Sequence, residues 1–231
     1  MIRAILFDKD GTLTDFRATW ERWLGGTLRE LAAATGTDAA DLGDAIGYDM
    51  AADRIRPGGM FVTAPGHHSS AALAPLVGWP VARMDEWLGG RIMTVPQVPV
   101  VPAGPLLADL AARGLRLGVL TNAEEAEAAH SLAALGATPY LDRVIGSDSG
   151  YGAKPDPRGA RAFAEGFGLD PGEVAMVGDG MTDMAAARGA GLVAVGVLTG
   201  TLDRAALAPH AEAVLDSVAE LPAWLDARGA G

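Results

Sequence analysis

The sequence predicts an α/β protein: a doubly wound parallel sheet, with a second, α-helical domain inserted after the first strand. Along most of the chain, short apolar runs that end abruptly in polar residues alternate with helix-like segments, the pattern of a doubly wound sheet. Residues 16–97 break this rhythm, because they contain helical periodicity but no clear pair of strands. These two observations define the predicted fold class.

The predicted strands are short apolar runs without an alternation of polar residues, which is typical of strands buried on both faces of a parallel sheet. They occupy residues 2–7, 115–120, 144–145, 174–177, 192–197 and, more weakly, 213–215. Ligands of such sheets bind beyond the carboxyl ends of the strands. The polar residues that follow these runs are therefore the candidates for a functional site.

Helix-like segments separate the predicted strands, and each is closely followed by a glycine, the residue that most often ends a helix. The segments are 105–113, 124–135, 157–167 and 181–190, and the glycines are Gly114, Gly136, Gly168 and Gly191. The order of strands and helices predicts that helices cover both faces of the sheet.

The segment 16–97 is far longer than the roughly dozen residues that a crossover between neighbouring parallel strands needs. Its periodicity predicts helices over 17–35, 39–55 and 81–92. We therefore expect two domains: an α/β core formed by residues 1–15 and 98–231, and a helical domain formed by residues 16–97. The expected hinges are residues 14–16 and the proline-rich segment 95–105.

Composition excludes several classes of function. The chain of 231 residues has a net charge of −11 and contains no cysteine. Its acidic balance disfavours nucleic acids and anionic membranes as partners, and the lack of cysteine rules out disulfides, thiolate metal sites and a cysteine nucleophile. No apolar run approaches the ~18 residues of a spanning helix, and no signal-peptide pattern is evident. We expect a cytoplasmic protein, either a monomer or a homodimer.

Two carboxylates, Asp8 and Asp10, lie at the tip of the first predicted strand. Buried carboxylates so close together are unfavourable unless their charge is offset, and a divalent cation such as Mg²⁺ accepts oxygen ligands of this kind. Gly11 allows a sharp turn that offers backbone N–H groups to an anion. An ordinary Asp-Gly turn after a strand is the alternative interpretation.

Three further strand ends carry polar residues of complementary chemistry. Thr121 and Asn122 offer a hydroxyl and an amide to phosphate oxygens, although a helix N-cap is the more common role of such a pair, and the two roles are compatible. Lys154 precedes a proline and offers a positive charge, although a solvated lysine is the simpler interpretation. Asp179 and Asp183 stand at a strand tip and in the following turn, where both can face one metal ion, although an acidic helix start is favourable by itself.

Taken together, these motifs resemble those of the haloacid dehalogenase-like superfamily of phosphohydrolases. The segment Phe7-Asp8-Lys9-Asp10-Gly11-Thr12-Leu13 is similar to the first family motif and Thr121 to the second. Lys154 in Lys-Pro-Asp-Pro is similar to the third motif, and Gly178-Asp179-Gly180-Met181-Thr182-Asp183 to the fourth. The inserted helical segment resembles a C1-type cap, as found in the phosphoglycolate phosphatase-like subgroup.

The resemblance implies a role for each motif residue. Asp8 is the expected nucleophile that forms an aspartyl phosphate, and Asp10 the general acid and base. Asp8, Asp10, Asp179 and Asp183 are the expected ligands of Mg²⁺, with Asp10 contributing its backbone carbonyl. The residues expected to bind the phosphate are Gly11, Thr121, Asn122, Lys154 and, from the start of the cap, Arg17. Lys154 is also expected to balance the negative charge of Asp8.

The implied function is hydrolysis of a small phosphorylated metabolite, for which phosphoglycolate is the first candidate. A mutase of the β-phosphoglucomutase kind shares every residue named above and stays open. A binding protein on the same fold is the alternative outside enzymes. Dehalogenase members of the superfamily lack an aspartate equivalent to Asp10; chloride departs without an acid, whereas an alkoxide needs one, so Asp10 favours phosphate esters.

Overall fold

The computed structural model describes residues 1–229 of the chain. The chain divides into two compact units, one formed by Met1–Asp15 with Gln97–Gly231 and the other by Phe16–Pro96. We refer to them as the core unit and the helical unit. Each has a hydrophobic core of its own.

The core unit contains a six-stranded sheet in the order β5-β4-β1-β6-β7-β8, in which neighbouring strands all run parallel. The strands are β1 (Ala4–Phe7), β4 (Arg116–Leu120), β5 (Arg143–Ile145), β6 (Val174–Gly178), β7 (Val193–Val197) and β8 (Ala213–Leu215). The predicted α/β fold class is confirmed. All four residues of β1 are fully buried, which explains why that strand is an uninterrupted apolar run.

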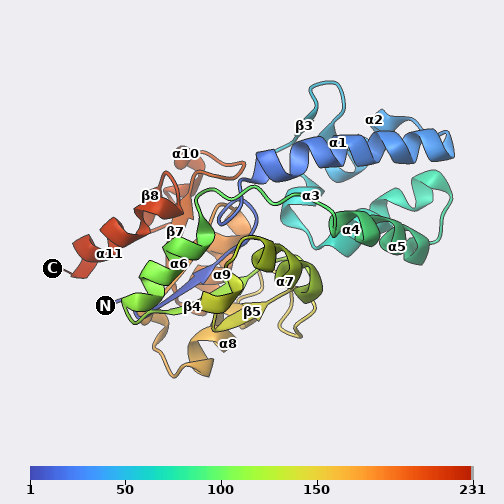
Figure 1. Ribbon diagram of the computed structural model, residues 1–231. Helices are drawn as coiled ribbons and strands as arrows, with labels where there is room; N and C mark the ends of the chain where they lie inside the picture. The colour runs from blue at the N-terminus through green and yellow to red at the C-terminus, as the bar shows by residue number, and fades with distance from the viewer. Residues whose placement is uncertain (230–231) are drawn as a thin grey trace. The chain divides into compact units, whose positions relative to one another are not determined.

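Helices cover both faces of this sheet (Figure 1). The helices of the core unit are α6 (Ala103–Ala112), α7 (Glu125–Ala134), α8 (Arg158–Gly166), α9 (Met181–Ala190), α10 (Arg204–Leu207) and α11 (Leu221–Gly229). Side chains of successive residues of β1 pack on opposite faces of the sheet. Phe7 belongs to the hydrophobic cluster that includes Leu107 of α6 and Leu132 of α7. Leu6 belongs to the other cluster, with Phe163 of α8 and Met184 of α9.

The order of the strands places β1 at the point where the chain reverses its direction of growth across the sheet. After β1 the chain adds β4 and β5 on one side, then returns to add β6, β7 and β8 on the other. Phe7 pairs in register with Val119 of β4 and with Val177 of β6. The residues that follow these three positions therefore meet at one edge of the sheet, where ligands bind in doubly wound folds.

The helical unit contains α1 (Phe16–Thr35), α2 (Ala39–Ile46), α3 (Met60–Thr63), α4 (Gly66–Leu73) and α5 (Val81–Ile92). Helix α1 contributes more buried residues to its core than any other element, among them Trp20, Leu24 and Leu28. The expected single helix over residues 39–55 is wrong. Gly47, with a φ of +84°, ends α2 in the left-handed conformation, and the chain continues as a short hairpin.

That hairpin pairs β2 (Tyr48–Asp49) with β3 (Arg54–Ile55) in antiparallel orientation. The buried Tyr48 anchors it, because its hydroxyl donates to the Asp53 carboxylate at 2.7 Å and lies 3.1 Å from the Glu21 carbonyl of α1. Among the described residues, no helix is both long and apolar enough to cross a membrane.

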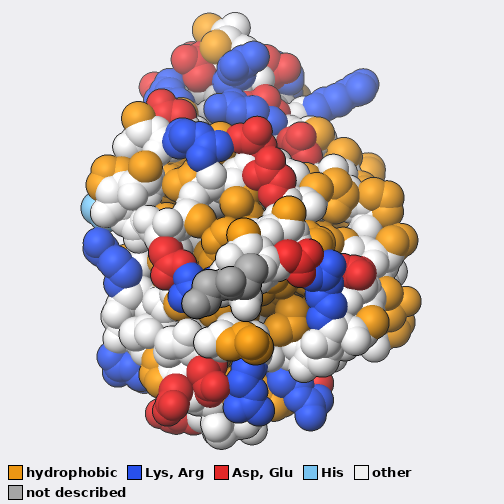
Figure 2. All heavy atoms as spheres, turned by 90° about the vertical axis from the view of Figure 1, so that its left-hand side faces the viewer, with side chains coloured by type: hydrophobic (Ala, Val, Ile, Leu, Met, Phe, Trp, Pro, Cys, Tyr) orange, Lys and Arg blue, Asp and Glu red, His pale blue; other side chains and the backbone are white. Residues whose placement is uncertain are grey.

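The face shown in Figure 2 carries acidic and basic side chains interspersed with each other. The core unit has exposed ion pairs such as Arg113–Asp226 and Arg204–Asp216. Exposed pairs of this kind contribute little to stability, about 0–1 kcal/mol each. The hydrophobic layers on the two sides of the sheet therefore account for most of the stability of the core unit.

Candidate active site

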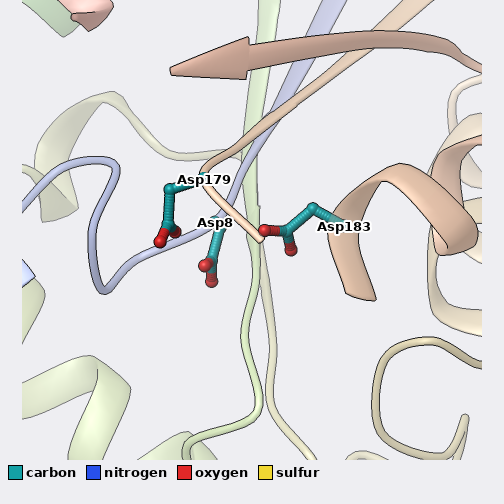
Figure 3. Close-up of side chains that lie close together, drawn as sticks. All are labelled: Asp8, Asp179 and Asp183. Carbon is teal, nitrogen blue, oxygen red and sulfur yellow. The ribbon is translucent and has the colours of Figure 1, made fainter. Parts of the chain in front are cut away.

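Three aspartates from three separate segments converge at the carboxyl edge of the sheet. Asp8 follows β1, Asp179 follows β6, and Asp183 lies in the first turn of α9. Each offers a carboxylate oxygen that lies within 4.8 Å of the other two, and all three residues are buried. Figure 3 shows the three carboxylates close together, with Asp8 between Asp179 and Asp183.

Lys154 links two of these carboxylates. Its Nζ lies 2.6 Å from Asp8 Oδ1 and 2.7 Å from Asp183 Oδ1, and its side chain is almost fully buried. Asn122 fixes the backbone at this lysine from both sides: Asn122 Oδ1 accepts from the Lys154 N–H at 2.8 Å, and Asn122 Nδ2 donates to the Lys154 carbonyl at 3.1 Å. The lysine is therefore held rigidly between the nucleophile candidate and α9.

The electrostatics of the cluster follow from three buried acids that share one lysine. Burial, together with the charge of Asp183, raises the pKa of Asp8 to about 7, although Lys154 opposes the shift. Burial also raises the pKa of Asp179 well above its usual range, and the charges of Asp8 and Asp183 add to the effect. Burial disfavours a charged Lys154, but Asp183 and Asp8 raise its pKa above the usual value. One lysine among three carboxylates leaves the cluster short of positive charge.

Asp10 lies in a second set of charged groups beside the first. Its Oδ2 lies 2.9 Å from Lys9 Nζ, and its Oδ1 lies 3.4 Å from the Thr14 hydroxyl. The same Lys9 Nζ donates to Glu127 Oε1 of α7 at 3.2 Å. Lys9 is completely buried; burial disfavours its charge, but Asp10 and Glu127 raise its pKa above the usual value. Lys9 also donates its backbone N–H to Asp8 Oδ1 at 2.6 Å.

Two glycines enclose the Asp179 carboxylate. Gly11 has a φ of +85°, and a Cβ there would lie 2.5 Å from Asp179 Oδ2. A Cβ on Gly200, in the loop after β7, would overlap the same carboxylate. The Thr199 hydroxyl donates to the Gly11 carbonyl at 2.6 Å, so the two glycine loops are tied together. This arrangement fixes the position of Asp179 and leaves room only for residues without a side chain.

The structure gives some predicted residues a different local role. The Gly11 N–H, expected to face an anion, donates to the Thr14 carbonyl at 2.9 Å. Thr121 is buried at the end of β4 and accepts from the Ala123 N–H at 3.2 Å. The N-cap interpretation of Thr121 and Asn122 is wrong, because the N-cap residue of α7 is Glu124.

Arg17, the candidate from the cap, belongs to α1 of the helical unit, where its Nη1 pairs with Glu21. The other predicted site residues belong to the core unit. Three residues that contact the candidate site residues of the core unit were not predicted from the sequence: Lys9, Glu127 and Gly200. The contacts of Glu127 and Gly200 depend on tertiary structure, and no local pattern marks them. Lys9 had one available signal, the rarity of lysine in this chain.

The donor set of the cluster fits a divalent cation. The three clustered side chains offer oxygen atoms only, which are the ligands that Mg²⁺ prefers. Three buried carboxylates with a single bridging lysine keep excess negative charge, which a dication offsets. The enclosure of Asp179 by Gly11 and Gly200 holds one donor in a defined position before any ion binds.

We expect the metal-free protein to lose stability as the pH rises. The folded-state pKa of Asp8 is about 7, above its ordinary value of 3.8, so the folded state binds this proton more tightly than the unfolded chain does. That contribution is complete below the ordinary pKa and is lost as the pH rises through about 7. In EDTA, the melting temperature is therefore lower at pH about 8 than at pH about 5.5.

Millimolar Mg²⁺ should restore the melting temperature at the higher pH, because a ligand of the folded state stabilises it. Differential scanning fluorimetry with and without EDTA measures both effects. The Asp8→Asn variant serves as the control, since it carries no proton to lose at this position and should show a weaker pH dependence. A melting temperature that Mg²⁺ leaves unchanged at the higher pH would contradict a preformed cation site.

Comparisons with known proteins place this arrangement in a family. Residues 2–191 match the haloacid dehalogenase-like hydrolase family. A phosphoglycolate phosphatase of Rhodospirillum rubrum is 42% identical over 121 residues, which are 52% of this chain and 50% of that protein. The chain thus spans about half the length of the first curated relatives it matches.

Two longer matches extend the similarity along the chain. A phosphoglycolate phosphatase of Yersinia pestis is 31% identical over 229 residues, with 95% of this chain and 91% of that protein covered. The crystal structure of a predicted phosphoglycolate phosphatase from Haemophilus somnus superposes with a TM-score of 0.74 at 18% identity, covering 97% of this chain and 98% of that one. The resemblance expected from the motifs is confirmed, and the chain belongs to the haloacid dehalogenase-like hydrolase family.

Proposed function

We propose that the protein is a Mg²⁺-dependent phosphatase that hydrolyses a small phosphorylated metabolite through an aspartyl phosphate on Asp8. The observation that carries this proposal is the convergence of Asp8, Asp179 and Asp183 around one centre, with Lys154 Nζ bound to two of them. The names of the relatives support phosphoglycolate as the first candidate substrate. The helical unit is the proposed cap, with Arg17 as a candidate substrate contact.

The cation would be held by Asp8, Asp179 and Asp183, with the Asp10 carbonyl as a further donor, and when bound it offsets negative charge and orients the phosphoryl group. Lys154 lowers the repulsion between the Asp8 carboxylate and an incoming phosphate. Thr121, at the tip of the neighbouring strand β4, is the proposed partner of a non-bridging phosphate oxygen.

In the first step, one oxygen of the Asp8 carboxylate attacks phosphorus and forms an acyl phosphate bond. The bond between phosphorus and the leaving oxygen breaks, and Asp10 in its protonated form transfers its proton to that oxygen. In the second step, the Asp10 carboxylate takes a proton from a water molecule as the water oxygen attacks phosphorus. Asp8 departs as a carboxylate, inorganic phosphate is released, and Asp10 is again protonated.

The proposed role of Asp10 predicts how the Asp10→Asn variant responds to different leaving groups. A good leaving group departs without a proton, whereas an alkoxide does not, and a general acid contributes about 10²–10⁴-fold to such a step. We expect kcat/KM to fall about 10²–10⁴-fold for alkyl phosphates such as phosphoglycolate. For p-nitrophenyl phosphate the loss should be at least about tenfold smaller.

Initial rates with both esters, at saturating Mg²⁺, provide this comparison. Asp148→Asn is a suitable control, because Asp148 is a core-unit acid whose Oδ1 accepts from the Glu125 backbone N–H. An equal loss of kcat/KM on both esters would contradict the acid role of Asp10.

The substrate itself is tested by a panel of phosphorylated metabolites with phosphate release as the readout. A mutase of the β-phosphoglucomutase kind would convert a hexose 1-phosphate into an isomeric sugar phosphate instead of releasing phosphate, and product analysis separates the two activities. A folded protein that binds Mg²⁺ but turns over none of these esters, nor p-nitrophenyl phosphate or acetyl phosphate, would support a non-catalytic binding role.

A further inference from the structure

This chain uses lysine in only two places. Of its 18 basic residues, two are lysines, Lys9 and Lys154, and the others are arginines. Both lysines are buried, with exposed fractions of 0% and 4%. Since lysine is ordinarily a surface residue that almost never becomes fully buried without a partner, both positions demand an explanation.

Each lysine joins one of the first-motif aspartates to a second carboxylate. Lys154 Nζ lies between Asp8 and Asp183, as described above. Lys9 Nζ lies 2.9 Å from Asp10 Oδ2 and 3.2 Å from Glu127 Oε1. The proposed function uses the first of these arrangements and leaves the second without a role.

Glu127 binds the Lys9 side chain from outside the loop that follows β1. It lies in α7, 118 positions further along the chain than Lys9, and the hydrogen bond between them connects the loop after β1 to that helix. A buried ammonium group is unfavourable unless it is paired, so the position of Lys9 depends on both carboxylates. Glu127 therefore prevents Lys9 from swinging away from Asp10.

We propose that Lys9, anchored by Glu127, is a positioning residue that orients the Asp10 carboxylate for proton transfer to the leaving group. This inference rests on the acid and base role proposed for Asp10. The ammonium group of Lys9 is a donor only, so Asp10 Oδ2, which it contacts, is the acceptor of that pair. Oδ1, 3.4 Å from the Thr14 hydroxyl, is then the oxygen that carries the transferable proton, and the hydroxyl can donate to Oδ1 when the carboxylate is charged or accept from it when it is protonated.

The proton balance of the reaction leaves Lys9 unchanged. In the first step the proton on Asp10 Oδ1 passes to the leaving oxygen, and Lys9 stays next to the carboxylate that results. In the second step Oδ1 receives a proton from the attacking water. Lys9 keeps its own protons throughout, and its contribution is to hold the carboxylate in one orientation in both steps.

The test compares two aryl phosphates in the double variant Lys9→Met with Glu127→Gln. The double variant removes both charges together, so that neither group is left buried without its partner. The expected loss in kcat/KM is at least about tenfold larger for phenyl phosphate, which has the poorer leaving group, than for p-nitrophenyl phosphate. Glu124→Gln is the matched control, since Glu124 is an exposed acid directly before α7, and should leave the ratio unchanged.

An equal loss on both esters would overturn the inference, because a merely structural role of Lys9 would not depend on the leaving group. Wild-type protein that hydrolyses neither ester would contradict the proposed function instead. The single variant Glu127→Gln keeps an acceptor for Lys9 and serves if the double variant does not fold. In this single variant, kcat/KM should again fall more for phenyl phosphate than for p-nitrophenyl phosphate, but the difference between the two losses should be smaller than in the double variant.

A spectroscopic measurement tests the contact without any turnover. Because the chain has two lysines, a proton–nitrogen correlation spectrum of lysine ammonium groups should show two signals that exchange slowly with water, and a Lys9→Met spectrum assigns one of them. The Lys9 signal should shift in Asp10→Asn and in Glu127→Gln, but not in Glu124→Gln. A Lys9 signal that Asp10→Asn leaves in place would overturn the inference, whatever the activity of the protein.

Discussion

Asp8→Asn is expected to reduce ester hydrolysis by at least about 10⁴-fold, the scale seen when a covalent nucleophile is removed. An amide is a much weaker nucleophile than a carboxylate, so the acyl phosphate no longer forms. The fold should survive. The structure gives a physical reason. Burial and the charge of Asp183 raise the pKa of Asp8, so the charged form of Asp8 is disfavoured in the metal-free protein. An asparagine has nearly the same shape and no charge, so it avoids this unfavourable burial of a charge.

Phosphate release from p-nitrophenyl phosphate and the melting temperature in EDTA at pH about 8 measure the two parts of this prediction. Asp109→Asn is the control for the loss of one negative charge in the core unit, since Asp109 is an exposed acid that pairs with Arg113. It should retain the wild-type rate. Substantial activity in Asp8→Asn, or a melting temperature clearly below that of the wild type in EDTA, would contradict this account of Asp8.

Gly200→Ala is expected to weaken Mg²⁺ binding at least about tenfold, the scale of changes made just outside a metal's own ligands. The added methyl group overlaps the Asp179 carboxylate, and the carboxylate has little space to retreat because Gly11 encloses it as well. Asp179 must therefore leave the position in which it faces Asp8 and Asp183. The activity at low Mg²⁺ concentration should fall accordingly.

Gly172→Ala provides a matched control for the glycine substitution. Gly172 belongs to the same unit, and a Cβ built there meets nothing within 4 Å. Isothermal titration calorimetry with Mg²⁺ alone should give the wild-type affinity for this control. The same affinity in Gly200→Ala would show that the loop after β7 does not hold Asp179 in place.

The sequence predicted the edge of the sheet at which the site lies, for a definite physical reason. Strands buried on both faces are continuous apolar runs, so the first polar residue after each run marks a strand end; Asp8, Thr121 and Asp179 were found in this way. The parallel sheet then brings these ends together. The order of the strands was not predicted, because pairing between β1 and β6 depends on contacts between segments that lie far apart in the chain.

The errors also have local physical causes. Residues 39–55 were expected to form one helix, but Gly47 adopts a positive φ and ends α2, and the segment turns back as a hairpin. A glycine within a periodic segment is compatible with a continuous helix and with a helix that ends there. The buried contacts of Tyr48 favour the hairpin. The segment 66–73 forms α4, although its weak amphipathic pattern gave no helix signal.

The residues missed at the site act through contacts that only the tertiary structure creates. Glu127 meets Lys9 because α7 follows β4, the neighbour of β1. Gly200 meets Asp179 because the loop after β7 passes beside β6. Lys9, in contrast, stands inside the first motif, and the scarcity of lysine elsewhere in the chain was the feature that set it apart.

The formation of an acyl phosphate on Asp8 is the central claim, and it can be tested by trapping. In Asp10→Asn, p-nitrophenyl phosphate should still phosphorylate Asp8, while hydrolysis of the product is slow because its base is missing. Borohydride reduces an aspartyl phosphate to homoserine, which survives digestion with trypsin. Cleavage after Arg3, Lys9 and Arg17 places Asp8 in the peptide 4–9 and position 10 in the peptide 10–17. We predict homoserine in the peptide 4–9 of the variant during turnover; turnover that leaves this peptide unreduced, or places the modification in the peptide 10–17, would contradict the account.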